Sequence, residues 1–331
     1  MCPPTPCLPH LRNPTERWYG TRPLSCWWRL TLEGRSGSGY TYAAPGAARL
    51  ICDLLAEAVL RIDAMAVPTA WHAMNRAVRN LGRPGLSAMA IAAVDVALWD
   101  LKARLLDLPL FSLIGPVRQS IAVYRSGGFT SYSIEQLRSQ LRAWVESGID
   151  QVKMKVGRNP ELDVEWVCAA REAIGPQAKL FVDANGAYSR KNALAQAEAF
   201  ADLDVTWFEE PAVSDDLEGL RLLRDRAPAS IDIAAGEYGY DLFYFRRMLD
   251  AGAVDVLQAD ATRCGGISGF LAAGALCQAR PLLLSAHTAP SLHAHPCCAL
   301  SPVCHLEYFF DHVRIEQMFF DGFLQPTGGA L

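Results

Sequence analysis

Seven short apolar runs of this sequence end in, or lead directly into, a residue that can take part in acid–base or metal chemistry. These residues are Lys155, Asp183, Glu209, Glu237, Asp260, His287 and Glu307, and successive members are 28, 26, 28, 23, 27 and 20 positions apart. Such spacing accommodates one strand, one helix and two loops. Because all strands of a parallel (β/α) barrel end at the same rim, the sequence predicts that these side chains meet at one mouth.

Three of these residues are carboxylates at neighbouring strand ends. Asp183, Glu209 and Glu237 are expected to end the third, fourth and fifth barrel strands, where they would repel one another unless a cation lies between them. A hard divalent cation accepts three protein oxygens and keeps positions for substrate and water. We therefore expect a Mg²⁺ cofactor, with Mn²⁺ as the alternative ion. The alternative interpretation is three surface acids near helix starts.

Two lysines mark the second strand. Lys155 ends it, and Lys153 points the same way because side chains alternate along a strand. Two ammonium groups beside a cation are expected to lower each other's pKa, and a neutral lysine is a usable base. The alternative is a salt-bridge network with the carboxylates, which is compatible with catalysis for Lys153 and less so for Lys155.

Asp260 and His287 are expected to end the sixth and seventh strands and thus to be neighbours. A carboxylate beside an imidazole fixes its tautomer and raises its basicity. Strands two and six are opposite each other in a barrel of eight. Lys155 and the His287–Asp260 pair should therefore approach a bound substrate from opposite faces.

Weaker signals come from residues near these strand ends. Glu307 ends the eighth strand and is expected either to donate to a substrate carboxylate when protonated or to hold a lysine or arginine. Ser126 could donate to developing oxyanion charge, with an ordinary loop serine as the alternative. Asn185 is expected to touch substrate or metal-bound water. The glycine-rich run at 265–269 resembles a phosphate-binding loop only weakly, and a tight turn is the preferred interpretation.

The elements that must position these residues alternate strictly from residue 120 onward. Strands are expected at 121–124, 151–156, 180–183, 205–209, 231–235, 254–259, 282–285 and 305–308, and helices at 133–147, 160–174, 190–201, 216–225, 242–251, 267–279 and 290–300. This order predicts an α/β protein with a TIM-type (β/α) barrel over residues 116–331 and right-handed connections. Residues 1–115 are expected to form a separate α+β domain, with one strand at 28–33, a turn at 35–40 and helices at 47–59, 71–79 and 87–106.

Composition excludes several classes of protein. The net charge of −4 offers no basic surface for nucleic acid, and no apolar stretch reaches membrane-spanning length. The ten cysteines show no CxxC pair and no metal-ligand spacing, which favours free thiols in a reducing compartment. Residues 1–10 lack a signal-peptide pattern, so we expect a cytoplasmic protein. No glycine fingerprint of a dinucleotide-binding fold follows an early strand.

Several short motifs, in order, resemble the enolase superfamily, mandelate racemase subgroup. They are VKMK at 152–155, VDAN at 182–185, WFEEP at 207–211, GE at 236–237, Asp260 with the glycine pair at 265–266, SAH at 285–287 and HLE at 305–307. The resemblance covers about residues 40–320 and implies that residues 1–115 cap the barrel. It implies Mg²⁺ ligation by Asp183, Glu209 and Glu237, acid–base roles for Lys155 and His287 with Asp260 supporting the histidine, and oxyanion assistance by Glu307 and Ser126. It also implies a homo-oligomer.

The resemblance implies removal of the proton α to the carboxylate of a small-molecule substrate through an enediolate. Mg²⁺, Lys153 and Glu307 would stabilise that anion. Dehydration of a sugar acid to a 2-keto-3-deoxy acid is the leading hypothesis, because the resemblance implies that such dehydratases are numerous. A racemase or epimerase of a 2-hydroxy acid is the alternative. Residues 1–30 do not resemble the hairpin that opens this family, and the chain ends early. A non-catalytic, metal-binding relic with an incomplete cap is therefore the alternative from another class.

Overall fold

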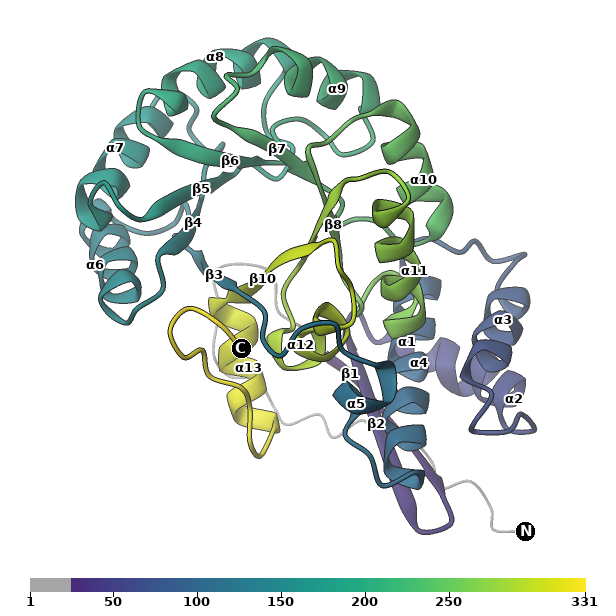
Figure 1. Cartoon of the computed structure of the whole chain (residues 1–331). Helices are drawn as coiled ribbons and strands as arrows, with labels where there is room; N and C mark the ends of the chain where they lie inside the picture. The colour runs from purple at the N-terminus through teal and green to yellow at the C-terminus, as the bar shows by residue number, and fades with distance from the viewer. Residues whose placement is uncertain (1–24) are drawn as a thin grey trace.

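The computed structural model describes residues 25–331, and predictions for residues 1–24 lie outside it. The described chain begins with an antiparallel hairpin of β1 (Ser25–Leu32) and β2 (Arg35–Tyr42) (Figure 1). The turn predicted at 35–40 is therefore wrong, because only Glu33 and Gly34 turn the chain. The expectation that residues 1–30 lack the opening hairpin of the family is also wrong, because β1 begins at Ser25 and pairs with β2.

Close packing explains why β2 resembles a turn in composition. A Cβ atom on Gly37 would lie 2.2 Å from the carbonyl oxygen of Ala97, and one on Gly39 would lie 2.1 Å from that of Ala93. Both carbonyls belong to the helix α4 (Leu86–Leu105). The glycines of β2 thus let a strand lie directly on a helix backbone, and they are not turn residues.

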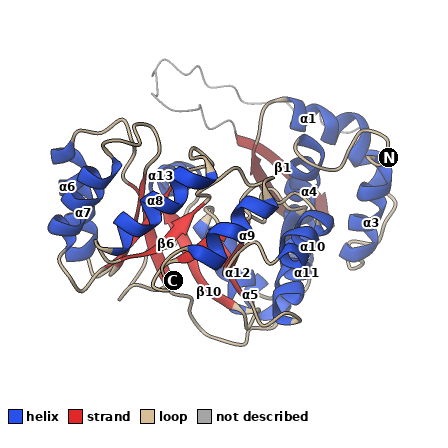
Figure 2. Ribbon diagram, turned by 90° about the horizontal axis from the view of Figure 1, so that it is seen from above, coloured by secondary structure: helices blue, strands red, loops and turns tan. Residues whose placement is uncertain are grey.

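The other helices of the N-terminal part are short. They are α1 (Gly46–Leu50), the π-helical turn η1 (Ile51–Leu55), α2 (Ala56–Val59), α3 (Val67–Ala77) and α5 (Leu110–Ile114). Helix α4 packs on the hairpin and on this cluster with one side, and on α11 (Gly266–Gln278) of the barrel with the other. This arrangement explains why its apolar residues cover more than one face. Figure 2 shows α1, α3 and α4 gathered beside α10 and α11.

Eight parallel strands close into a barrel. In chain order they are β3 (Val123–Gly127), β4 (Gln151–Lys155), β5 (Lys179–Asp183), β6 (Val205–Glu209), β7 (Asp232–Ala235), β8 (Val256–Ala259), β9 (Leu283–Ala286) and β10 (Val303–Phe309). Each pairs with the next, and β10 returns to pair with β3. The predicted barrel and the predicted strand order are confirmed.

Helices surround this barrel, as Figure 1 shows. Besides α11 they are α6 (Ile134–Glu146), α7 (Asp163–Ile174), α8 (Arg190–Ala201), α9 (Leu217–Arg226), α10 (Leu242–Ala251), α12 (Pro290–Cys298) and α13 (Phe310–Phe319). Ser189 caps the N-terminus of α8, because its hydroxyl accepts a hydrogen bond from the Asn192 backbone N–H. Helix α13 was not predicted, because it follows β10 with no turn residues between them.

An aromatic layer fills the barrel axis below its mouth. We call Tyr124, Phe181, Trp207 and His305 the ring layer; their ring centroids lie 4.8–6.3 Å apart and all four side chains are buried. Phe181 and Trp207 precede Asp183 and Glu209 by two residues, so each ring lies one layer beneath a carboxylate. The layer is therefore the floor on which the polar strand ends rest.

Two compositional predictions can be compared with the described part of the chain. Within residues 25–331, no helix has the length and apolar character needed to cross a membrane. The thiols of Cys168, Cys264 and Cys277 are free, as predicted.

Candidate active site

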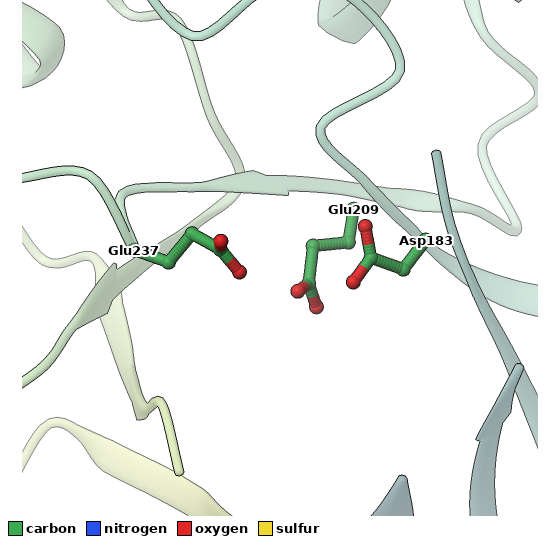
Figure 3. A group of neighbouring side chains, drawn as sticks. All are labelled: Asp183, Glu209 and Glu237. Carbon is green, nitrogen blue, oxygen red and sulfur yellow. The ribbon is translucent and has the colours of Figure 1, made fainter. Parts of the chain in front are cut away.

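Three carboxylates meet at the barrel mouth (Figure 3). Asp183 and Glu209 are the register-paired last residues of β5 and β6, and Glu237 follows β7 by two positions. One oxygen from each lies within 4.8 Å of the others, and the residues are at most 4% exposed. Gly236 makes the approach of Glu237 possible: its φ is +135°, and a Cβ there would lie 2.2 Å from the Gln258 carbonyl oxygen.

Lys153 lies at the centre of this negative charge. Its Nζ is 2.6 Å from Glu209 Oε1, 2.9 Å from Glu307 Oε1 and 3.3 Å from Asp183 Oδ2, and the side chain is fully buried. Burial alone would lower its pKa, but Glu209 and Glu307 outweigh burial and raise it. Lys153 is therefore charged and balances the charge of the carboxylates. This arrangement agrees with the alternative interpretation of Lys153 as part of a salt-bridge network.

Lys155 lies at the Asp183 side of the group. Its Nζ donates to Asp183 Oδ2 and, over 2.9 Å, to Asn185 Oδ1. Burial tends to lower its pKa, but Asp183 outweighs burial and the repulsion from Lys153, so the net direction is upward. The expected lowering of both lysine pKa values depends on a cation among the carboxylates, and the carboxylates by themselves have the opposite effect. Three nearby carboxylates contribute more than the two like charges do.

His287 and Asp260 lie at the Glu237 side. His287 Nδ1 is 2.9 Å from Asp260 Oδ2, and Nε2 is 3.1 Å from Glu237 Oε2. Burial tends to lower the pKa of His287, but Glu237 and Glu307 outweigh it and raise that pKa to about 10. Burial would raise the pKa of Asp260, yet His287 holds it below its usual range. The structure thus brings this pair together at the side of the carboxylates away from Lys155.

Glu307 contacts a charged lysine and a backbone N–H donor. Its Oε1 accepts from Lys153, and its Oε2 accepts from the Thr288 backbone N–H over 3.1 Å. Burial would raise its pKa, but Lys153 and His287 lower it to about 2. Of the two predicted alternatives, the structure shows the one in which Glu307 is ionised and holds a lysine.

Ser126 and Asn185 also lie at the mouth. Ser126 belongs to β3 and is buried, so its placement in a loop after the strand is wrong. Its hydroxyl has no hydrogen-bond partner among the described residues. Asn185 has φ +45°, and its backbone N–H donates to Asp183 Oδ1 over 2.9 Å. Asn185 therefore helps to orient the carboxylate beside Lys155.

The glycine-rich run at 265–269 joins the turn after β8 to α11: Gly265 ends the preferred tight turn, and residues 266–269 form the first turn of the helix. Gly265 and Gly266 have φ values of +83° and +89°, and α11 begins there. Asp95 of α4 accepts hydrogen bonds from the Ser268 backbone N–H and hydroxyl over 2.9 and 2.7 Å. A Cβ on Gly266 would lie 2.3 Å from Asp95 Oδ2. A carboxylate of the N-terminal part thus occupies the place that a phosphate would take.

Two residues of the site were missed by the sequence interpretation. Arg263 is 3.6 Å from Glu237 Oε1 and 3.7 Å from Asp260 Oδ2, so it adds positive charge between them. Glu210 is buried beside the three carboxylates, and burial together with Glu237 raises its pKa to about 10. The doubled glutamate of the WFEEP run was visible in the sequence, but alternation along a strand assigns its second member to the outer face.

The donor set fits a hard divalent cation. All three groups are buried oxygen donors, and octahedral Mg²⁺ places its ligand oxygens about 3–4 Å apart. The observed limit of 4.8 Å is close to that geometry.

Two family models match this chain. The one described as mandelate racemase/muconate lactonizing enzyme, N-terminal domain, matches residues 28–115, and the one described as enolase C-terminal domain-like matches residues 136–331. The chain belongs to the mandelate racemase/muconate lactonizing enzyme family of the enolase superfamily, and the resemblance stated from its motifs is confirmed.

Characterised relatives include enzymes named for sugar acids or their derivatives and an enzyme named as a hydrophobic dipeptide epimerase. The 3,6-anhydro-alpha-L-galactonate cycloisomerase of Streptomyces coelicolor is 34% identical over 287 residues, which are 85% of this chain and 78% of the relative. The L-talarate/galactarate dehydratase of Salmonella typhimurium is 32% identical over 309 residues, which are 90% of this chain and 75% of the relative. The family is thus one of enzymes, with both lyases and isomerases among the relatives.

Solved structures share the whole architecture. A mandelate racemase/muconate lactonizing enzyme-like protein from Rubrobacter xylanophilus is 51% identical, with a TM-score of 0.90 over 93% of this chain and 85% of that one. L-talarate dehydratase from Polaromonas sp. JS666, complexed with Mg and L-glucarate, is 32% identical, with a TM-score of 0.84 over 92% of this chain and 86% of that one. Magnesium is therefore bound by a close structural neighbour, in agreement with the expected cofactor.

Proposed function

We propose that this chain is a Mg²⁺-dependent enzyme that removes the proton α to the carboxylate of a sugar acid and expels the β-hydroxyl group. The observation that carries the proposal is the order of groups at the mouth. Lys155 contacts Asp183 at one side of the three carboxylates, and His287 lies 3.1 Å from Glu237 at the other. Two proton-carrying groups thus stand on either side of one candidate cation site.

Asp183, Glu209 and Glu237 would hold the Mg²⁺. When bound, the ion offsets the negative charge that keeps the proton on Lys155 and polarises the substrate carboxylate as enediolate charge develops. Lys153 and Glu307 support this arrangement, because Lys153 ties Glu307 to Glu209 through contacts of 2.9 and 2.6 Å. The buried hydroxyl of Ser126, which has no partner among the described residues, is suited to donate to an oxyanion. Asn185 positions Asp183 and Lys155 for the same substrate.

The proton balance of dehydration needs two groups. The neutral form of Lys155 or of His287 takes the α-proton, so that the C–H bond breaks and its electron pair forms the enediolate. The opposite group gives a proton to the β-hydroxyl, and the C–O bond breaks as water leaves. The enol then takes a proton from solvent at the β-carbon and loses the proton of its hydroxyl to solvent, which gives the 2-keto-3-deoxy acid. Asp260 keeps His287 oriented throughout by accepting from Nδ1 over 2.9 Å.

Racemisation or epimerisation of a 2-hydroxy acid is the second candidate. It uses the same two groups, because a proton taken by Lys155 on one face can be replaced by a proton from His287 on the other. The relic alternative loses part of its basis, because β1 and β2 supply the hairpin that was expected to be missing. We also keep as proposals a domain boundary between residues 115 and 116, a cytoplasmic location and a homo-oligomer.

The test is turnover of a sugar-acid panel in D₂O with Mg²⁺, followed by NMR and by a keto-acid assay. We expect keto-acid product from at least one member of the panel and none after chelation of the metal. Lys155→Ala and His287→Asn should then separate α-proton exchange on substrates of opposite α-configuration, with losses of at least about 100-fold for the matching face. Lys179→Ala, an exposed lysine at the other end of β5, is the matched control.

Each outcome distinguishes the candidates. Exchange without keto acid would favour the racemase or epimerase. Neither product nor exchange across the panel, despite tight Mg²⁺ binding, would favour the relic. Full turnover by both variants would show that Lys155 and His287 are not the acid–base groups.

A further inference from the structure

We propose that Thr262 is a positioning residue for the Asp260–His287 pair, and that Thr41 of the N-terminal hairpin anchors it. This inference deepens the proposed function and rests on it, since it assigns to the N-terminal part a role in one of the two acid–base groups. Sequence spacing gave no sign of it, because the two threonines are 221 positions apart.

Thr262 holds one oxygen of Asp260 with two donors. Its backbone N–H and its hydroxyl both donate to Asp260 Oδ1, each over 2.7 Å. The other oxygen, Oδ2, is thereby left facing His287 Nδ1 at 2.9 Å, with the Thr288 hydroxyl farther away at 3.4 Å. Because Oδ1 is fixed twice, the carboxylate cannot rotate about its χ2 angle without breaking both hydrogen bonds.

Thr41 fixes Thr262 in turn. The Thr41 hydroxyl donates to the Thr262 carbonyl oxygen over 2.6 Å, and both threonines are completely buried. A second attachment from the N-terminal part lies three residues on, where Trp71 Nε1 donates to the Gly265 carbonyl oxygen over 2.7 Å. On the barrel side, His293 Nε2 accepts from the Ala261 backbone N–H over 2.8 Å. The turn after β8 is thus held from both parts of the molecule.

The turn itself is closed by the backbone of Asp260. Its carbonyl oxygen accepts from the backbone N–H groups of Arg263 and Cys264 over 2.9 and 2.8 Å. In such a tight turn the position of Thr262 constrains that of Asp260, because few backbone torsions lie between the two residues. The hairpin therefore helps to set the direction of the imidazole, although neither threonine touches His287.

This arrangement predicts that substitution of Thr262 impairs proton transfer only on the face of the substrate that His287 serves. Lys155 receives its orientation from Asp183 and Asn185, on the other side of the carboxylates, and neither threonine contacts these residues in the described structure. Loss of the Thr262 hydroxyl should impair the steps that use His287 and spare those that use Lys155. A general loss of packing would impair both.

The experiment measures α-proton exchange in D₂O on substrates of opposite α-configuration. Thr262→Val removes the hydroxyl donor, keeps the shape and retains the backbone N–H, while Thr262→Ser restores the donor. We expect Thr262→Val to lower the kcat of His287-dependent exchange about 10- to 100-fold, the range for one hydrogen bond to a charged group. KM and Lys155-dependent exchange should stay within about twofold, and Thr262→Ser should recover most of the loss.

Thr41→Val tests the anchor without altering the turn, and we expect a loss of a few-fold on the same face. Its matched control is Thr31→Val, an exposed threonine of the same hairpin. Equal losses on both faces, or no loss for either threonine, would overturn the proposal. If Thr262→Val does not fold, the face selectivity of Thr41→Val decides the question.

A second readout does not need turnover. In ¹⁵N-histidine protein, the proton on His287 Nδ1 should give a downfield, slowly exchanging NMR signal, assigned by its absence in His287→Asn. We expect the signal in the wild type and in Thr262→Ser, and its broadening or loss in Thr262→Val. An unchanged signal in Thr262→Val would overturn the positioning role. If the wild type exchanges no substrate proton at all, the proposed function fails, whereas this signal still decides the role of Thr262.

Discussion

Lys153→Met tests whether one buried lysine balances the charge of the barrel mouth. Lys153 Nζ lies within 3.3 Å of three carboxylates, all of them buried. Methionine keeps the unbranched shape of the side chain and removes the charge. Removal of one partner from a buried ion pair typically costs about 3–5 kcal/mol, because the other partner keeps its charge without compensation. With three partners, we expect a loss at the upper end of that range.

The pH dependence of this loss has a definite sign. Lys153 contributes to the lowered pKa of Glu307, about 2 in the folded protein against an ordinary 4.5. A carboxylate with a lowered pKa adds stability that is fully present above pH 4.5 and is lost as the pH falls toward 2. Lys153→Met lacks this contribution. The gap in unfolding free energy between wild type and variant should therefore be widest near neutral pH and should narrow below pH 4.5.

The assay is urea unfolding followed by circular dichroism at pH 7.5 in the presence of a chelator. Lys179→Met, on an exposed lysine, is the matched control and should cost less than about 0.5 kcal/mol. Mg²⁺ at 100 times its dissociation constant should stabilise the wild type by about 2.7 kcal/mol. If Lys153→Met lost less than about 1 kcal/mol without metal, the charge-balancing role inferred from its contacts would be refuted.

Two further substitutions test the local geometry. Gly236→Ala should cost about 2–5 kcal/mol of stability and weaken Mg²⁺ binding at least tenfold by calorimetry, because its Cβ would lie 2.2 Å from the Gln258 carbonyl oxygen at a φ of +135°. Gly82→Ala, at φ +90° with nothing within 4 Å, is the control, and equal effects from both would contradict the steric explanation. Asp95→Asn tests the contact between α4 and α11. Burial raises the pKa of Asp95 from 3.8 to about 7, so the folded state binds the proton of this carboxyl group more tightly than the unfolded state does. The stability that this group contributes is therefore lost as the pH rises toward 7. The stability of wild type relative to Asp95→Asn should thus fall by about 3 kcal/mol between pH 5 and pH 8 in urea unfolding, and a constant difference would show that Asp95 does not titrate there.

The strand ends could be predicted from the sequence because two regularities fix them. Alternation along a strand places Lys153 and Lys155 on one side, and parallel strands in a barrel bring Asp183 and Glu209 to one rim. These regularities depend only on local periodicity and on chain order. They need no knowledge of which side chains touch across the molecule.

What could not be predicted depends on contacts between distant segments. Gly37 and Gly39 resemble turn residues until α4 is seen to lie on them. Ser126 falls inside β3 because β4 and β10 both pair with that stretch of chain. The pKa of Lys155 depends on the sum of several neighbouring charges, whose distances the sequence does not contain.

The ring layer determines from which end of the barrel small molecules can reach the polar strand ends. Tyr124, Phe181, Trp207 and His305 are buried and in mutual contact across the axis, so the barrel is blocked at its lower end. The carboxylates lie on the other side of this layer, at the end of the barrel where Thr41 contacts the turn after β8. The aromatic rings close the axis beneath the polar strand ends, so any molecule or proton that reaches these residues must come from the mouth side of the layer.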